Sequence, residues 1–292
     1  MNAKKIIGFS LGVLCLSASA GVVLAQDSAP GVNGPPKVLV IQREYLKPGK
    51  SGNVHERSEG AFVRAMSAAK WPTHYIGMNS LSGPSRALFF VPYASFAAWE
   101  KDNQATEHNA TLSGAMDRAE LADGDLLTSY DSSVWTYNEE DSLNAEGGLA
   151  DQHYMELTSF KVRPGHRKEW EDLVKMAKSG YAKVPNMHWA TFESMYGADN
   201  GGVYLVVTAM KSLSEVDAED GQSKQFLEAM GENGMKKFGE LEASCIEKVQ
   251  TNLFQFAPKM SYPPEEWVKA NPDFWKPKMA APMKKDAAKP EQ

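Results

Sequence analysis

The sequence predicts an α+β protein built from two copies of one βαββαβ unit. The first observation is a Pro-Gly pair that ends a strand-like stretch twice, at Pro48-Gly49 and at Pro164-Gly165, a shift of 164 − 48 = 116 residues. The second is that a stretch with helical spacing follows each pair. The third is that the remaining segments recur in the same order. A period of this length is too long for a solenoid repeat, so it indicates a duplicated domain.

The first copy spans residues 37–137. It opens with VLVIQREYL, whose apolar and β-branched residues predict a buried strand. After the Pro-Gly pair, apolar residues return at helical spacing between Val54 and Ala69. The expected elements are, in order, a strand over 38–46, a helix over 54–69, strands over 73–81 and 87–93, a helical region over 95–122 and a strand over 126–137.

The second copy spans residues 153–256 and repeats this order. Its first helix has the most regular pattern, because Trp170, Leu173 and Val174 fall on one face of a 3.6-residue period. Strands are expected over 153–162, 187–195, 203–210 and 247–256, with a second helical region that ends near residue 242. The acidic, glycine-containing stretch 138–152 has the composition of a linker between the copies.

This order of elements is that of the ferredoxin-like split βαβ unit. Its two helices cover one face of a four-stranded antiparallel sheet and leave the other face bare. A bare apolar face must be covered in water, so we expect the two sheets to pack face to face as an intramolecular α/β barrel. In the first strands we expect Leu39, Ile41, Met155 and Leu157 under the helices. The bare face would then carry Val38, Val40, Gln42, Glu44, Tyr154, Glu156, Thr158 and Phe160.

Residues 1–25 have the pattern of an export signal. Lys4 and Lys5 precede an apolar run, and Ala25 supplies a small residue at the predicted cleavage point. An uncleaved membrane anchor is the alternative, since the stretch from Ile6 to Ala25 nearly reaches the length of a spanning helix, about 20 residues. We expect cleavage, and therefore a periplasmic or secreted protein.

The segments outside both copies differ in composition. Residues 26–36 form a short leader. Residues 257–276 carry Trp267, Phe274 and Trp275 among prolines, which predicts either a strap packed on the body or a segment that docks to a partner. Lysine, alanine and proline without aromatic residues predict a disordered tail over 277–292.

Net charge limits the kinds of binding partner that we expect, and cysteine content limits the disulfides. The chain has 31 basic and 37 acidic residues, and loss of Lys4 and Lys5 with the signal leaves 29 − 37 = −8. An acidic protein without basic clusters is a poor candidate for nucleic acid or anionic lipid. Cleavage also removes Cys15 and leaves Cys245 alone, so no internal disulfide is expected. We expect no nucleic-acid partner and no membrane association after cleavage, and the oligomeric state stays open.

At this point the chain resembles the dimeric α/β-barrel superfamily, which includes antibiotic-biosynthesis-type monooxygenases, haem-degrading monooxygenases and NIPSNAP-like proteins. The resemblance covers both copies. It depends on the Pro-Gly pair after the first strand and on YASFAAWEKD at 93–102, which is similar to that family's stretch after the third strand. The second copy has MKSLSEVDAED there, without the tryptophan. The resemblance implies two ferredoxin-like units joined into a barrel around a pocket.

The resemblance also implies a set of catalytic residues. Haem-degrading members use an Asn on the first strand together with a Trp and a His near the second helical region. Gln42, Trp99 and His108 fall at these places, although Gln replaces Asn and the Trp-to-His spacing is only approximate. The second copy offers Thr158 and Val216 and no histidine. Core packing of Trp99 and a surface position for His108 are the plainer interpretation, and a shared site requires all three side chains to converge in one cavity.

The ligand-binding candidates come from the expected bare face and from equivalent positions of the two copies. They are Glu44, His74, Tyr154, Glu156, Phe160 and His188. His74 and His188 stand at the start of equivalent strands, each before an aromatic residue, so inheritance explains the pair as well as function does. None of the six histidines lies at a short ligand-type spacing, so the sequence indicates no metal site.

The sequence favours a binding function over a defined reaction. We expect an exported protein that binds a small, largely apolar or aromatic molecule between its sheets. Two alternatives stay open: a monooxygenase-like enzyme that acts through the first repeat, and a non-catalytic interaction module that uses the strap. The residues themselves indicate no cofactor, and haem stays open only through the resemblance.

Overall fold

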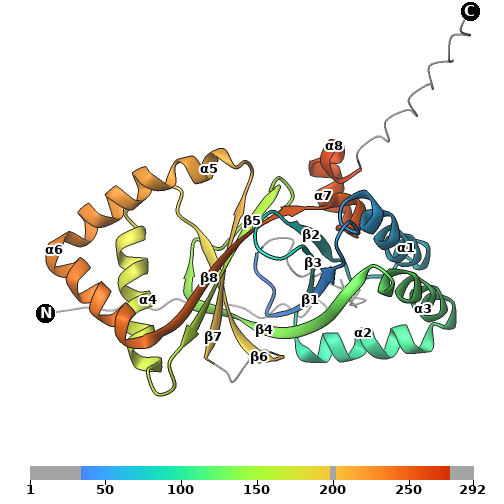
Figure 1. Cartoon of the computed structure of the whole chain (residues 1–292), viewed down its shortest axis with the longest axis horizontal. Helices are drawn as coiled ribbons and strands as arrows, with labels where there is room; N and C mark the ends of the chain where they lie inside the picture. Colours follow the sequence, from blue (N-terminus) through green and yellow to red (C-terminus); the bar gives the residue numbers. More distant parts are fainter. Residues whose placement is uncertain (1–33, 198–201, 277–292) are drawn as a thin grey trace, which may run out of the picture.

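A computed structural model describes residues 34–197 and 202–276 of the chain (Figure 1). The predicted export signal, most of the leader and the predicted tail lie outside the described residues. The first repeat contains β1 (Val38–Leu46), α1 (Asn53–Ala69), β2 (Ile76–Ser80), β3 (Arg86–Tyr93), α2 (Phe96–His108), α3 (Ala110–Gly124) and β4 (Leu127–Leu143). The second contains β5 (Tyr154–Val162), α4 (Arg167–Tyr181), β6 (Trp189–Tyr196), β7 (Val203–Met210), α5 (Ser214–Asp217), α6 (Glu219–Cys245) and β8 (Ile246–Phe256).

The eight strands form one closed barrel in the order β1-β3-β2-β8-β5-β7-β6-β4. Each repeat therefore contributes a ferredoxin-like sheet, β4-β1-β3-β2 or β6-β7-β5-β8, as the sequence predicts. The two sheets join at their edges, where β2 pairs with β8 and β4 pairs with β6, both antiparallel. Closure leaves neither sheet with an unpaired edge strand, and it encloses the sheet faces that the helices do not cover.

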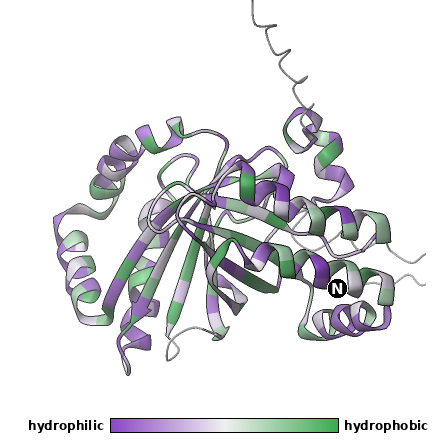
Figure 2. Cartoon of the chain, turned by 45° about the vertical axis from the view of Figure 1, so that its right-hand side comes forward, coloured by the Kyte–Doolittle hydropathy of each residue, from purple (hydrophilic) through white to green (hydrophobic). Residues whose placement is uncertain are grey.

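The helices lie outside the barrel in two groups. In Figure 1, α1, α2 and α3 lie together on one side of the strands, and α4 and α6 lie together on the opposite side. Figure 2 shows hydrophobic and hydrophilic residues in alternation along the long helices, as expected of helices with one buried face. The long helix α6 is interrupted at Gly231, whose positive φ of 63° is a conformation that glycine adopts without strain.

Two segments differ from the predicted boundaries. The helical region expected over 95–122 is two helices, because the Asn109 side chain accepts a hydrogen bond from the backbone N–H of Leu112 and starts α3 there. The fourth strand, expected to end at residue 137, continues to Leu143, so the predicted linker begins as strand. The indole of Trp189 donates to the backbone carbonyl of Asp141 over 2.8 Å and holds this extension against β6.

The faces of the first strands are the reverse of the prediction. Leu39 and Ile41 lie in the apolar cluster that fills the barrel, whereas Val38 and Val40 pack toward Trp99 under the helices. The physical reason is that all four residues from Val38 to Ile41 are buried, since β1 has covered faces on both sides. A strand that is apolar on both faces gives no alternation from which its inward face can be read.

The same reversal holds in the second repeat. Met155 and Leu157 face the barrel interior, while Phe160 packs on Trp170 of α4, outside the barrel. The interior cluster consists of Leu39, Ile41, Ile76, Met78, Leu88, Phe90, Trp135, Met155, Leu157, Phe192, Leu205, Val207, Ala209, Phe254, Phe256, Trp267 and Trp275.

The segment after β8 packs against one end of the barrel. It contains a 3₁₀ turn (Pro258–Met260), α7 (Glu265–Ala270) and α8 (Pro272–Trp275). Trp267 and Trp275 are only 4% and 3% exposed, and the Trp275 indole donates to the Ala150 carbonyl over 2.8 Å. The aromatic residues thus form the packed strap, and they are not available as a docking segment. Over the described part of the chain, no helix combines the length and the apolar character of a membrane span.

Candidate functional site

A cavity of about 740 Å³ opens at one end of the barrel. Neighbouring strands all run antiparallel, so every second strand in the barrel order runs the same way. Strands β1, β2, β5 and β6 therefore all start at this end. The duplication thus brings equivalent positions of the two repeats to one rim, and His74 and His188 both line the cavity.

The wall of the cavity is mostly apolar. Its deeper part is formed by residues that point into the barrel, namely Leu39, Ile76, Phe90, Met155, Phe192, Val207 and Ala209. The rim is more polar and includes part of the stretch between the repeats, with Asn144 and Gln152, and residues after β7, with Lys211 and Gln222. Trp267 of the strap closes one side. An apolar interior with a few polar groups at the rim is the usual composition of a small-molecule site.

His74 presents a partly free imidazole at this rim. Its Nδ1 lies 3.2 Å from the Tyr262 carbonyl oxygen, which can only accept, so Nδ1 carries the hydrogen. Burial lowers the pKa of His74 against the opposing effects of that carbonyl and of Glu266 and Glu265. The neutral ring then offers Nε2 as an acceptor.

His188 differs from its counterpart in the first repeat. Its Nδ1 lies 2.9 Å from the Asn186 carbonyl oxygen, and its Nε2 lies 2.9 Å from the Ala209 carbonyl oxygen. Each ring nitrogen thus faces a backbone carbonyl oxygen, and this side chain ties the start of β6 to the end of β7. Of the two predicted histidines at the rim, only His74 keeps a nitrogen for a ligand.

The three residues implied as catalytic do not converge in the cavity. Gln42 is paired across the sheet with Phe89, which lies in the cluster under the helices, so Gln42 also points away from the barrel interior. Trp99 packs beside Tyr93, with ring centroids 6.1 Å apart, outside the barrel. His108 is exposed at the last residue of α2, where its Nδ1 contacts the Gln104 carbonyl oxygen. Gln42, Trp99 and His108 therefore do not form a shared site, which would require their side chains to converge in one cavity.

The remaining predicted ligand-binding residues also point outward. Tyr154, Glu156 and Phe160 alternate with the inward Met155 and Leu157 and therefore face the second helix layer. Burial and the carboxylate of Glu219 on α6 raise the pKa of Glu156, in agreement with that placement. These three residues belong to the packing between strands and helices, and not to the wall of the cavity.

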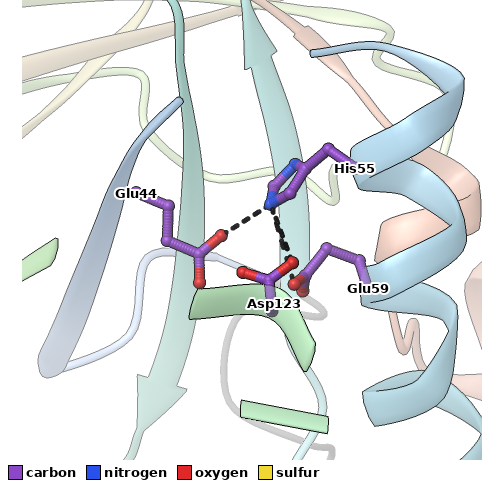
Figure 3. A group of neighbouring side chains, drawn as sticks. All are labelled: Glu44, His55, Glu59 and Asp123. Carbon is purple, nitrogen blue, oxygen red and sulfur yellow. Dashed lines mark hydrogen bonds and ion pairs between the residues drawn. The ribbon is translucent and has the colours of Figure 1, made fainter. Parts of the chain in front are cut away.

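Glu44 points to the helices as well, and there it meets a histidine. His55 Nε2 lies 2.9 Å from Glu44 Oε2, and Glu59 and Asp123 complete a buried group of four side chains (Figure 3). Sequence spacing indicated no metal site, whereas the fold brings these four potential metal ligands together. The one sequence feature that could have indicated this group is the pair His55 and Glu59, which lie four residues apart on one helix face. Asp123 is 68 residues further along the chain than His55, and no local pattern connects them.

Comparisons with known proteins found matches among solved structures only. No family model matches the sequence, and no curated protein matches it. Among solved structures, an anthrone oxidase-like protein is 16% identical, with a TM-score of 0.47 over 77% of this chain and 94% of that chain. A mutant chlorite dismutase from Candidatus Nitrospira defluvii is 12% identical, with a TM-score of 0.45 over 80% of this chain and 95% of that chain.

A protein from Lactobacillus acidophilus that is assigned as a monooxygenase is 10% identical, with a TM-score of 0.46 over 75% of this chain and 93% of that chain. Similarity at this level carries no activity over to the present chain. The barrel itself decides the class of fold. With a closed ring of eight strands from two ferredoxin-like repeats, the chain has the dimeric α/β-barrel architecture within a single polypeptide.

Proposed function

We propose that this protein is exported and binds a small, largely apolar or aromatic molecule in the cavity at the end of its barrel. The observation that carries the proposal is the cavity of about 740 Å³, which falls in the range of pockets that enclose a small ligand. Its apolar part is continuous with the barrel core, so an apolar ligand would complete the core at that end. Each Å² of apolar surface removed from water contributes about 25 cal/mol.

The rim favours a ligand with one polar end. His74 offers Nε2 as an acceptor, and Lys211 is among the residues that line the same rim. A hydroxyl or carboxyl group on the ligand would find a partner there, while its apolar body would enter the barrel. The residues of the cavity include no nucleophile paired with a base, so binding is better supported than a reaction.

Filling the cavity tests the proposal. Ala209 lines the cavity and points inward from β7. We expect Ala209→Trp to weaken binding of an apolar fluorescent dye such as 8-anilinonaphthalene-1-sulfonate by about tenfold or more, equivalent to about 1.4 kcal/mol. Native mass spectrometry of the purified wild-type protein should in parallel detect a co-purifying small molecule that the variant lacks.

The matched control is Thr208→Trp, at the adjacent position on the opposite face of β7. Thr208 pairs with Glu156 across the sheet and therefore faces the helices. This variant should bind the dye as wild type does. The proposal fails if the wild-type protein binds neither dye nor co-purifying ligand, or if Ala209→Trp binds the dye with unchanged affinity.

The export part of the proposal has a separate test. Expression with the full N-terminus in a bacterium, followed by fractionation and intact-mass analysis, should yield a periplasmic chain that begins at Gln26. A membrane-bound chain that keeps residues 1–25 would support the anchor alternative. Neither result affects the test of the cavity.

A further inference from the structure

The first repeat buries four ionisable side chains in one place between β1, α1 and α3. Glu44 comes from the strand, His55 and Glu59 come from successive turns of α1, and Asp123 comes from the end of α3 (Figure 3). Their exposed fractions are 9%, 0%, 3% and 2%. Ionisable residues are almost never buried to this degree unless they are paired or coordinate a metal.

His55 Nε2 is the centre of the group. It lies 2.9 Å from Glu44 Oε2, 3.7 Å from Glu59 Oε1 and 3.6 Å from Asp123 Oδ1. One ligand atom from each residue lies within 4.8 Å of all the others. A tetrahedral site with metal–ligand bonds of about 2.0–2.1 Å has ligand atoms about 3.4 Å apart. Small side-chain rotations would bring the four atoms to that geometry around a single ion.

Several atoms of the group have no hydrogen-bond partner within the described part of the chain. They are both carboxylate oxygens of Asp123, Oε1 of Glu59 and Nδ1 of His55. Asp123 and Glu59 are more than nine-tenths buried, and Figure 3 shows their carboxylates turned toward the His55 ring. Unpartnered buried oxygens that share one point are the arrangement that a cation would satisfy.

The four buried side chains also shift one another's pKa values. Burial, reinforced by the nearby carboxylates, raises the pKa of Glu59 to about 9 and also raises the pKa of Glu44. Burial disfavours the charged ring of His55, but the carboxylates of Asp123 and Glu44 outweigh it and raise the pKa of His55 to about 10. A divalent ion would balance two of the three carboxylate charges.

We propose that Glu44, His55, Glu59 and Asp123 bind one divalent first-row transition-metal ion, of the type of Zn²⁺ or Mn²⁺. An imidazole nitrogen among the ligands favours a transition-metal ion, whereas a site with oxygen ligands alone would favour Mg²⁺ or Ca²⁺. Four protein ligands in a buried group make a closed site, which is the form of a structural metal centre. The ion would join β1 to α1 and α3. Glu44 lies five residues along β1 from Leu39 at the cavity, about 17 Å away, so this site is separate from the proposed ligand site.

The experiment uses the purified full chain after treatment with a chelator and removal of that chelator. The metal-free protein is titrated separately with Zn²⁺, Mn²⁺, Mg²⁺ and Ca²⁺, and bound metal is measured by elemental analysis after gel filtration. We expect one equivalent of Zn²⁺ or Mn²⁺ per chain, together with a metal-dependent rise in melting temperature. Glu59→Gln and Asp123→Asn should weaken binding by more than about 100-fold, beyond the 10–100-fold loss typical of residues that only support a ligand.

The matched control is His166→Gln. His166 Nδ1 faces Glu169 Oε1 at 3.3 Å, and both side chains are more than a third exposed, so the change removes a histidine–carboxylate pair outside the cluster. It should leave metal binding unchanged. A second readout separates a metal site from a purely structural ion pair: the melting temperature of Glu59→Gln should not rise when metal is added, because the variant lacks one ligand oxygen, whereas that of wild type should rise.

Three results would overturn the proposal. The first is a wild-type protein that binds none of the four ions at millimolar concentration. The second is binding that Glu59→Gln and Asp123→Asn leave intact. The third is binding of Mg²⁺ or Ca²⁺ without Zn²⁺ or Mn²⁺, which would contradict the proposed class of ion. None of them bears on dye binding in the barrel cavity.

Discussion

The two repeats differ in the side chains that fill the space between the first strand and the helices, which are ionisable in the first repeat and aromatic in the second. Phe160 corresponds to Glu44 at the shift of 160 − 44 = 116 that relates the Pro-Gly pairs. Where Glu44 meets His55 in the first turn of α1, Phe160 meets Trp170 in the first turn of α4, with ring centroids 5.3 Å apart. The side chains around this pair are mostly apolar, with Tyr204 stacked on Trp170 at 4.5 Å, and a single carboxylate, that of Asp141, accepts from the Trp170 indole over 3.2 Å.

The second repeat shows that this fold does not require several ionisable residues between the first strand and the helices. The second repeat closes the gap between strand and helices with Trp170, Leu173 and Cys245, each no more than 5% exposed. The first repeat places three carboxylates there, at a desolvation cost of several kcal/mol for each ion that stays charged. Because the same architecture can fill this position with mostly apolar side chains, the four ionisable side chains of the first repeat favour the proposed metal site.

The largest expected effect is on the apolar side of the comparison. Trp170→Ala should destabilise the protein by ~3–5 kcal/mol, since it leaves a cavity where the indole packs on Phe160 and Tyr204. Chemical denaturation measures the loss, and added Zn²⁺ or Mn²⁺ should restore none of it. A loss below ~1 kcal/mol would mean that the second repeat does not depend on this packing.

A smaller effect, of opposite sign, is expected when the first repeat is made more like the second. Glu44→Leu combined with Glu59→Leu leaves His55 and Asp123 as a single buried pair. We expect the metal-free double variant to be more stable than metal-free wild type by ~1–4 kcal/mol, since apolar residues often outperform buried ionic groups. Its denaturation midpoint should not respond to metal. A strongly destabilised variant would show that the four side chains support the fold without any ion.

The smallest expected effect concerns the two histidines at the rim. The folded-state pKa of His74 is lowered, so the unfolded chain binds the proton more readily than the folded chain does. This contribution to stability is complete above the unfolded pKa of about 6.5 and is lost as the pH falls through that value toward the lower folded pKa. We expect His74→Gln, which keeps a neutral donor near the Tyr262 carbonyl, to flatten the acid side of the melting-temperature profile.

The control for this effect is His166→Gln on the surface of the second repeat. This variant shows how much of the change comes from replacing any histidine by glutamine away from the rim. Identical acid sides for wild type and His74→Gln would mean that the His74 ring is protonated as readily in the folded protein as in the unfolded chain. His188→Gln tests a different property: loss of its two backbone contacts should lower the melting temperature at every pH.

The site was less predictable than the fold, for reasons that particular residues illustrate. Duplication marks His74 and His188 as equivalent positions in the sequence, and both line the cavity. The sequence predicts Gln42 and Glu44 on the bare face of the sheet because Leu39 and Ile41 suit the face under the helices. In the structure both side chains face the helices. The sequence could not indicate this, because the four residues from Val38 to Ile41 are buried on both faces of the strand. Trp99 and His108 match a family pattern in sequence, but the helix that carries them lies outside the barrel.

The sequence by itself determined the two repeats, the order of their elements and the barrel that their bare sheet faces form. These follow from local periodicity and from the need to bury apolar sheets, and both can be read along the chain. Only the tertiary structure decided which face of each strand points inward and which ionisable groups meet. Asp123 joins His55 because α3 packs beside α1, and that contact depends on the register of whole helices on a sheet. No short stretch of sequence records such a register, because many alternatives bury a similar apolar area.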